Sequence, residues 1–83
     1  MNITDLRAPV PEADGPIKDV YDDTYKRLLP KIEAKILRYI LHGYSTKQMK
    51  IEGPRIEQRE GGGMTMIVNV TVDGPPMNAR AMK

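Results

Sequence analysis

The sequence predicts a small α+β domain in which one amphipathic helix packs on a small antiparallel β-hairpin or sheet. Two patterns predict this class: apolar residues recur at helical spacing over residues 17–42, and they alternate over residues 64–72. A triple glycine separates the alternating run from residues 55–60, the nearest segment that can pair with it. These elements define a single small domain over residues 17–74.

The two ends of the chain are expected to be extended arms. Residues 1–16 contain three prolines among scattered apolar positions, and residues 75–83 begin with two more prolines. Neither segment offers enough apolar surface to pack as an element of its own. If the N-terminal arm is ordered, another surface must order it.

The most regular pattern is the helical one over residues 17–42. Its apolar positions step by three or four along the chain: Ile17, Tyr21, Tyr25, Leu28, Ile32, Ile36 and Ile40. Pro30 interrupts this run, so we expect the helix to be kinked or split there. Gly43 follows the last turn and is expected to end the helix.

The second regular pattern predicts a strand over residues 64–72. One face would carry Met64, Met66, Val68, Val70 and Val72, and the other face Thr65, Ile67, Asn69 and Thr71. The expected partner, residues 55–60, has Ile56 as its one apolar residue. Because an isolated hairpin is marginal, the strong strand is expected to need the helix or the edge of a neighbouring chain.

The expected core is thin for a domain of this size. The 83 residues include no Cys, Phe or Trp, so disulfides are excluded and large buried aromatics are few. A core of this length supplies only about 3–5 kcal/mol of net stability. We therefore expect a homo-oligomer or a subunit of a larger protein assembly. The expected core or interface residues are Tyr25, Leu28, Ile32, Ile36, Ile40, Met66, Val68 and Val70.

The composition gives little material for catalysis. One His, His42, and one Ser, Ser45, lie close together without an obvious carboxylate to orient the imidazole. We expect no catalytic residues, no metal site, no cofactor and no small-molecule substrate, so the protein is not expected to be an enzyme. Without a long apolar run or a secretory signal, we expect no membrane association and a cytoplasmic (or, for a viral protein, virion) location.

The charge is unevenly distributed although the net charge is only +2. Residues 1–25 hold six acids and two bases, whereas residues 26–59 hold nine bases and three acids. Part of this excess forms a candidate basic helix face with Lys47 close behind it: Arg27, Lys31, Lys35, Arg38 and Lys47. Such a face suits nucleic acid or another anion, an acidic protein surface, or simply solvent.

One segment resembles a known nucleic-acid-binding motif. Leu29, Pro30 and Glu33, followed by the Gly43-Tyr-Ser-Thr-Lys-Gln48 stretch, are similar to the first half of a LuxR-type helix-turn-helix. The resemblance implies DNA binding, but it stops at Met49, after which the sequence has no apolar helix that could contact bases.

These observations favour a small non-enzymatic interaction or assembly protein. It would bind a protein partner or copies of itself, as a virion structural or accessory component or a compact inhibitor does. The alternative function is a small nucleic-acid-binding regulator that uses the basic helix face.

Overall fold

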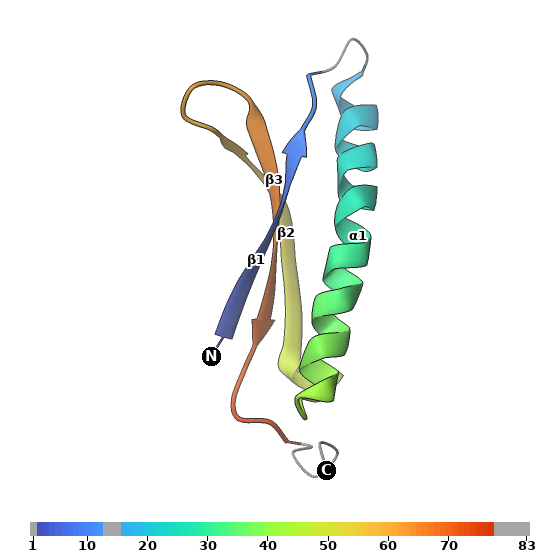
Figure 1. Cartoon of the computed structure of the whole chain (residues 1–83), viewed down its shortest axis with the longest axis vertical. Coiled ribbons are helices and arrows are strands. Elements are labelled where there is room, and N and C mark those ends of the chain that lie inside the picture. Colours follow the sequence, from blue (N-terminus) through green and yellow to red (C-terminus); the bar gives the residue numbers. More distant parts are fainter. Residues whose placement is uncertain (1, 13–15, 78–83) are drawn as a thin grey trace.

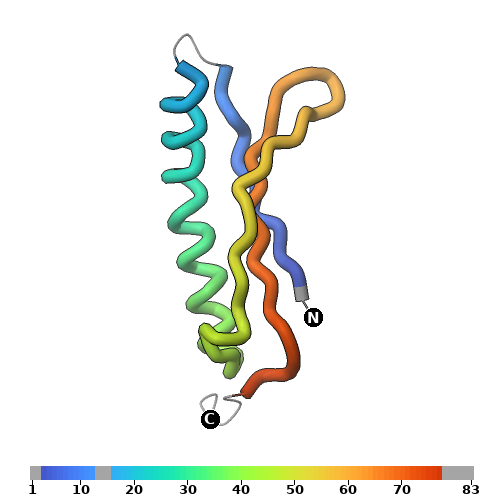
Figure 2. Tube along the Cα trace, turned by 180° about the vertical axis from the view of Figure 1, so that it is seen from behind, coloured from blue at the N-terminus to red at the C-terminus, as the bar shows by residue number. Residues whose placement is uncertain are grey.

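The computed structural model describes residues 2–12 and 16–77. Within them, one long helix packs against a three-stranded antiparallel sheet, so the protein has the predicted α+β fold (Figure 1). The elements in chain order are β1 (Asn2–Val10), α1 (Ile17–Leu41), the short 3-10 helix η1 (Thr46–Gln48), β2 (Met49–Gln58) and β3 (Met64–Val72). The strand order is β1-β3-β2, which makes β1 and β2 the two edge strands (Figure 2).

Helix α1 is continuous from Ile17 to Leu41 and passes through Pro30 without a break. The helix is therefore not split in two. Its C-terminus is closed by a Schellman motif in which Gly43 has φ +93°. The Tyr44 N–H donates to the Tyr39 carbonyl and the Gly43 N–H to the Ile40 carbonyl, both at 3.0 Å. Gly43 thus ends the helix as predicted.

Strand β3 is the central strand and pairs with β1 along its whole length and with β2 on both sides of an irregularity. It forms the expected hairpin with β2, but β2 begins at Met49 rather than at residue 55. The pairing shifts between Glu52 and Arg55, where Gly53 and Pro54 form an irregularity joined by a cis peptide bond. Gly53 has φ +108°, and a Cβ there would lie 2.9 Å from the Ile67 carbonyl oxygen. The backbone at this point therefore requires glycine.

The N-terminal segment differs from the expected arm. Asn2–Val10 forms edge strand β1, paired with β3 so that Leu6 lies opposite Val68. Ala8 and Val10 are buried, and Leu6 packs against the core. The surface that orders this segment is thus β3 of the same chain. For the C-terminal arm, only residues 75–77 fall within the described residues.

The core lies between α1 and the sheet face that α1 covers. Leu28 and Ile32 from the helix meet one face of β1 and β3 there. Thr24 is also buried, and its Oγ1 donates to the Val20 carbonyl at 2.7 Å, so its hydroxyl is satisfied within the helix. The strand residues of the core are Ala8, Val10, Met66, Val68 and Val70.

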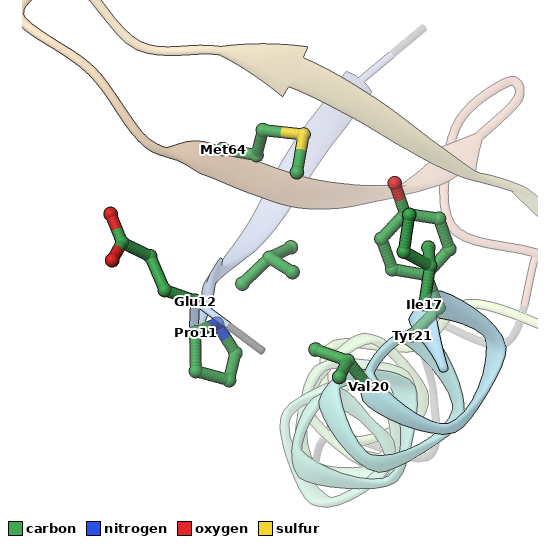
Figure 3. Close-up of a pocket in the computed structure, with 7 residues that line it drawn as sticks. Pro11, Glu12, Ile17, Val20, Tyr21 and Met64 are labelled. Atoms are coloured by element: carbon green, nitrogen blue, oxygen red, sulfur yellow. The ribbon is translucent and has the colours of Figure 1, made fainter. Parts of the chain in front are cut away.

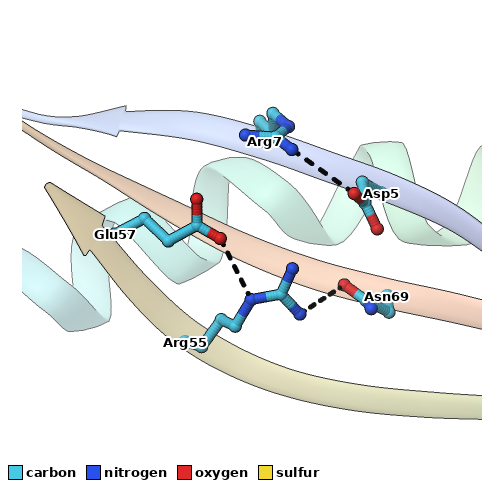
Figure 4. A network of polar contacts seen from close by, with 5 residues as sticks. All are labelled: Asp5, Arg7, Arg55, Glu57 and Asn69. Carbon is cyan, nitrogen blue, oxygen red and sulfur yellow. Dashed lines mark hydrogen bonds and ion pairs between the residues drawn. The ribbon is translucent and has the colours of Figure 1, made fainter. Parts of the chain in front are cut away.

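The opposite sheet face carries alternating charges (Figure 4). Arg7 pairs with Asp5 at 3.3 Å, and Arg55 pairs with Glu57 at 3.4 Å. Arg55 also donates to Asn69 Oδ1 at 3.0 Å. Arg7 and Arg55 flank Ile67 in the register, and Ile67 is fully buried on this face.

Candidate functional site

Strand β2 is the least covered element of the sheet. The close contacts of α1 are with β1 and β3, and every β2 residue except Met49 and Ile56 is exposed. An apolar pocket of about 400 Å³ therefore opens between the helix and β2, and we call it the α1–β2 groove. Its lining residues are Tyr21, Asp22, Tyr25, Pro54, Ile56 and Met66.

The apolar surface continues from this groove towards the C-terminal end of α1. Leu29, Ile36 and Ile40 follow Tyr25 on the same side of the helix by their spacing. Leu29 is 38% exposed and Ile40 is 41% exposed. An apolar stripe of the helix, exposed at Leu29 and Ile40, thus borders the groove.

Strand β2 adds a second exposed apolar residue at the level of Ile40. Ile51 pairs with Val70, which pairs on its other side with Thr4. Thr4 shares a 2.7 Å hydrogen bond with Tyr39, the helix residue next to Ile40. Ile51 is 46% exposed although it is on the face of the sheet that carries the helix. Exposed apolar residues grouped in this way are typical of an interaction surface.

The two edge strands of the sheet differ in whether other residues of the chain bind their outward main-chain groups. Main-chain hydrogen bonds of an antiparallel pair alternate, so every second residue of an edge strand directs its N–H and C=O outwards. On β1, Lys31 Nζ donates to the Arg7 carbonyl at 3.1 Å, and Pro9 has no N–H to offer. The β1 edge is therefore partly blocked by the protein's own residues.

Two hydrogen bonds at the ends of β2 identify the residues that direct their main-chain N–H and C=O groups outwards. Asp73 N–H donates to the Gln48 carbonyl, and Arg59 N–H donates to the Gly63 carbonyl. Counting by twos from these pairs, the residues that direct their main chain away from β3 are Met49, Ile51, Ile56 and Gln58. Among the described residues, no side chain donates to these outward carbonyls.

The predicted core or interface residues separate into three groups. The structure buries Leu28, Ile32, Met66, Val68 and Val70. Tyr25 and Ile36 are partly buried at the margin of this core. Ile40 lies outside it on the exposed stripe beside the groove.

The predicted basic residues share one side of α1, except for Lys47. Lys31, Lys35 and Arg38 line a shallow groove of about 250 Å³ with Leu6 of β1, and Arg27 is one turn away. Lys35 Nζ lies 5.7 Å from the centre of the Tyr39 ring. Lys47 belongs to η1, beyond the helix end. The structure therefore brings three of the five together, and Lys31 is already bound to β1.

Gln48 holds the C-terminal end of β3 in place, which the sequence pattern did not indicate. Its Nε2 donates to the carbonyls of Asp73 and Pro75 at 2.9 and 2.7 Å, and its Oε1 accepts the Ser45 N–H at 3.0 Å. Ser45 Oγ in turn accepts the Lys47 N–H at 3.2 Å, which forms a capping box at η1. The Ser-x-x-Gln spacing was the available signal for part of this arrangement.

A further pocket of about 340 Å³ lies where α1 begins. Figure 3 shows Ile17, Val20 and Tyr21 of the helix on one side of it and Met64 of β3 on the other. Its lining is mostly apolar, with Glu12 at its margin.

No helix among the described residues has the length and apolar character needed to cross a membrane. After Gly43 the chain forms η1 and then β2, so the segment that resembles a helix-turn-helix is not followed by a second α-helix. Comparison with protein-family models, with curated proteins and with solved structures gives no match.

Proposed function

We propose that this chain is a small non-enzymatic assembly protein that works by binding protein chains, copies of itself first, through the α1–β2 groove. The observation that carries this proposal is the exposure of Leu29, Ile40 and Ile51 around an edge strand that α1 leaves uncovered. Burial of such residues in an interface is worth roughly 25 cal/mol per Å² of apolar surface. Association would thus add to the stability of a chain with a small core.

Ser45, the one candidate hydroxyl nucleophile of this type, has a structural role, which supports a non-enzymatic function. Ser45 Oγ caps η1 by accepting the Lys47 N–H. His42 is the C-cap residue of α1, and its main-chain N–H donates to the Arg38 carbonyl. Among the described residues, no hydrogen bond joins the Ser45 hydroxyl to the His42 imidazole, as a nucleophile paired with a base would require.

A groove variant tests the proposal. Ile40→Asp places a charge beside the groove at a position that is already 41% exposed, so we expect a loss of self-association with little change in fold. Leu41→Asp is the matched control, because Leu41 is the next helix residue and is 67% exposed. Light scattering after size exclusion should show a dimer for wild type and Leu41→Asp, and a monomer for Ile40→Asp. A wild-type chain that is monomeric at every micromolar concentration overturns the proposal.

The basic helix face supports a second candidate function, binding of nucleic acid. Arg27 and Arg38 are exposed on the side of α1 that carries Lys31 and Lys35. A row of cations along a helix can contact successive phosphates without reading sequence. Two of its members have other contacts, since Lys31 bonds to Arg7 and Lys35 lies over Tyr39.

Binding to generic duplex DNA at low salt tests this second function. If it holds, affinity should fall steeply as salt is raised, because counterions are released on binding. Replacing Lys35 and Arg38 with Glu should remove the binding and leave the melting curve nearly unchanged. Absence of binding by the wild-type chain at low salt contradicts this function.

A further inference from the structure

We propose that a second copy of this chain adds to the edge of β2 that faces away from β3, in antiparallel orientation, with Ile51 of one copy opposite Ile56 of the other. The proposal rests on the self-association argued above and names the strand, the register and the side chains that would join the copies. It gives a symmetric pair in which both copies use the same surface.

The β2 edge has the main-chain groups that such an addition needs. Met49 and Ile51 before the Gly53–Pro54 irregularity, and Ile56 and Gln58 after it, direct their N–H and C=O groups away from β3. An antiparallel strand in the proposed register would place Met49 opposite Gln58 and Ile51 opposite Ile56. Each outward-directed residue then faces another one, so both can be hydrogen-bonded.

The charge pattern of β2 selects this orientation. Both isoleucines lie between a cation and an anion, in the order Lys50-Ile51-Glu52 and Arg55-Ile56-Glu57. In the proposed antiparallel register, Lys50 lies opposite Glu57 of the second copy, and Glu52 lies opposite Arg55 of the second copy. A parallel alignment of the same strands would instead place like charges opposite each other, which is unfavourable.

The charged side chains of β2 are exposed enough to exchange their ion-pair partners within the chain for partners in a second copy. Lys50 and Glu52 pair with each other at 3.5 Å within the chain, but their side chains are 75% and 55% exposed. Arg55 and Glu57 form a similar pair in which both side chains are 48% exposed. Ion pairs this exposed contribute little to stability within one chain. Exchanging them for ion pairs between the two copies therefore costs little free energy.

The apolar residues would meet on the other face of the extended sheet. Two antiparallel neighbouring strands are related by a two-fold axis perpendicular to the sheet. This axis leaves each face of the sheet on its own side, so the helices of both copies cover the same side of the extended sheet. Ile51 and Ile56 of both copies would then lie next to each other between the two helices, beside the exposed Leu29 and Ile40. The β1 edge is less suited, since Lys31 occupies the Arg7 carbonyl.

Complementary charge variants test the proposal. One variant carries Lys50→Glu and Arg55→Glu, and the other carries Glu52→Lys and Glu57→Lys. Each variant alone should self-associate more than about a hundredfold more weakly than wild type, because only like charges then meet across the edge. An equimolar mixture should restore the dimer, since every pair across the edge is again of opposite sign. Sedimentation velocity of each variant and of the mixture gives the result.

A matched control and the circular dichroism of each variant separate association from folding. Lys18→Glu with Lys26→Glu makes the same change in charge at exposed helix positions and should leave the dimer intact. Wild-type-like association of either β2 variant alone, or failure of two folded variants to associate when mixed, overturns the proposed edge. In both cases a dimeric wild type leaves self-association itself standing.

Cysteine cross-linking tests the register without changing the charges. The chain has no cysteine of its own, so each introduced cysteine is the one thiol of its chain. A mixture of Ile51→Cys and Ile56→Cys chains should form a disulfide-linked dimer on mild oxidation, whereas each chain alone should cross-link poorly. Opposed Cα atoms in an antiparallel pair are about 5.5 Å apart, within reach of a disulfide. Efficient cross-linking of Ile51→Cys alone would contradict the register, and no cross-link in any combination would contradict the β2 edge.

Discussion

Lys31 Nζ donates a 3.1 Å hydrogen bond to the main-chain carbonyl of Arg7, and so a helix side chain closes part of the β1 edge. Lysine and proline on edge strands are devices by which proteins avoid pairing with other chains. The β1 edge has its own Pro9 and is also covered by Lys31 of α1, which bonds to the Arg7 carbonyl. Strand β2 also contains a lysine and a proline, Lys50 and Pro54, but among the described residues no side chain donates to the carbonyls that it directs outwards on either side of its irregularity. This asymmetry is the basis for assigning association to β2.

The first prediction concerns the Lys31 contact. Lys31→Met removes the donor to Arg7 and leaves the β1 edge open, so we expect species larger than a dimer to appear at high concentration. Arg27→Met is the control, since Arg27 is an exposed cation one turn away on the same helix side. Light scattering across a concentration series measures the effect. Identical size distributions for the two variants would show that Lys31 does not protect the edge.

The second prediction concerns the core. Leu28 is 0% exposed, and Leu28→Ala should lower the free energy of unfolding by about 2–5 kcal/mol because it leaves a cavity. Leu37 lies on the same helix but is 57% exposed, so Leu37→Ala should change the free energy by less than about 0.5 kcal/mol. Urea titrations of both variants at the same protein concentration give the comparison. Equal losses of stability would mean that α1 packs by another face.

The third prediction concerns the irregularity in β2. Gly53 and Gly62 have φ of +108° and +109°, but only at Gly53 would an added Cβ meet a backbone atom, the Ile67 oxygen at 2.9 Å. Gly53→Ala should therefore destabilise the protein more than Gly62→Ala, whose cost is the backbone strain of about 1–3 kcal/mol alone. Thermal melts of the two variants isolate the steric effect. A Gly62→Ala loss as large as that of Gly53→Ala would contradict the close approach.

The fourth prediction concerns Gln48. Gln48→Glu keeps the acceptor for the Ser45 N–H but replaces the donor to Asp73 and Pro75 with a carboxylate oxygen. We expect a loss of about 1–3 kcal/mol at neutral pH, because two carbonyls then face a negative charge. These carbonyls disfavour the charged form, so the folded-state pKa of the new carboxyl should be raised above its unfolded value. The loss should shrink as pH falls through that folded-state pKa, where the protonated acid donates again.

Urea titrations of Gln48→Glu and wild type at neutral and acidic pH measure this difference. A gap in stability that stays constant with pH would show that the donor role of Gln48 is unimportant.

The fold was predictable wherever a pattern is local. The helical spacing from Ile17 to Ile40 and the alternation from Met64 to Val72 correspond to α1 and β3. Strand β1 was missed because its stability comes from pairing with a distant strand, as Leu6 does with Val68, and because the prolines of this segment suggested an arm. The alternation of Leu6, Ala8 and Val10 was the signal for it.

The candidate site was less predictable, since it depends on which strands the helix covers. The sequence grouped Ile40 with the core residues by its spacing, but α1 packs on β1 and β3 and leaves Ile40 beside an open strand. Similarly, the basic residues were recognisable as one helix side, but the bond from Lys31 to Arg7 follows only from the position of β1. Contacts between segments that are far apart in the sequence therefore cannot be predicted from periodicity alone.

We propose above that a second copy completes this chain through the surface between α1 and β2. Sedimentation equilibrium of the wild-type protein at micromolar concentration tests it most directly. We expect a mass twice that of the 9.4 kDa chain, shifting towards the mass of one chain on dilution. A mass of 9.4 kDa at all concentrations, with a cooperative melt that does not depend on concentration, would contradict it.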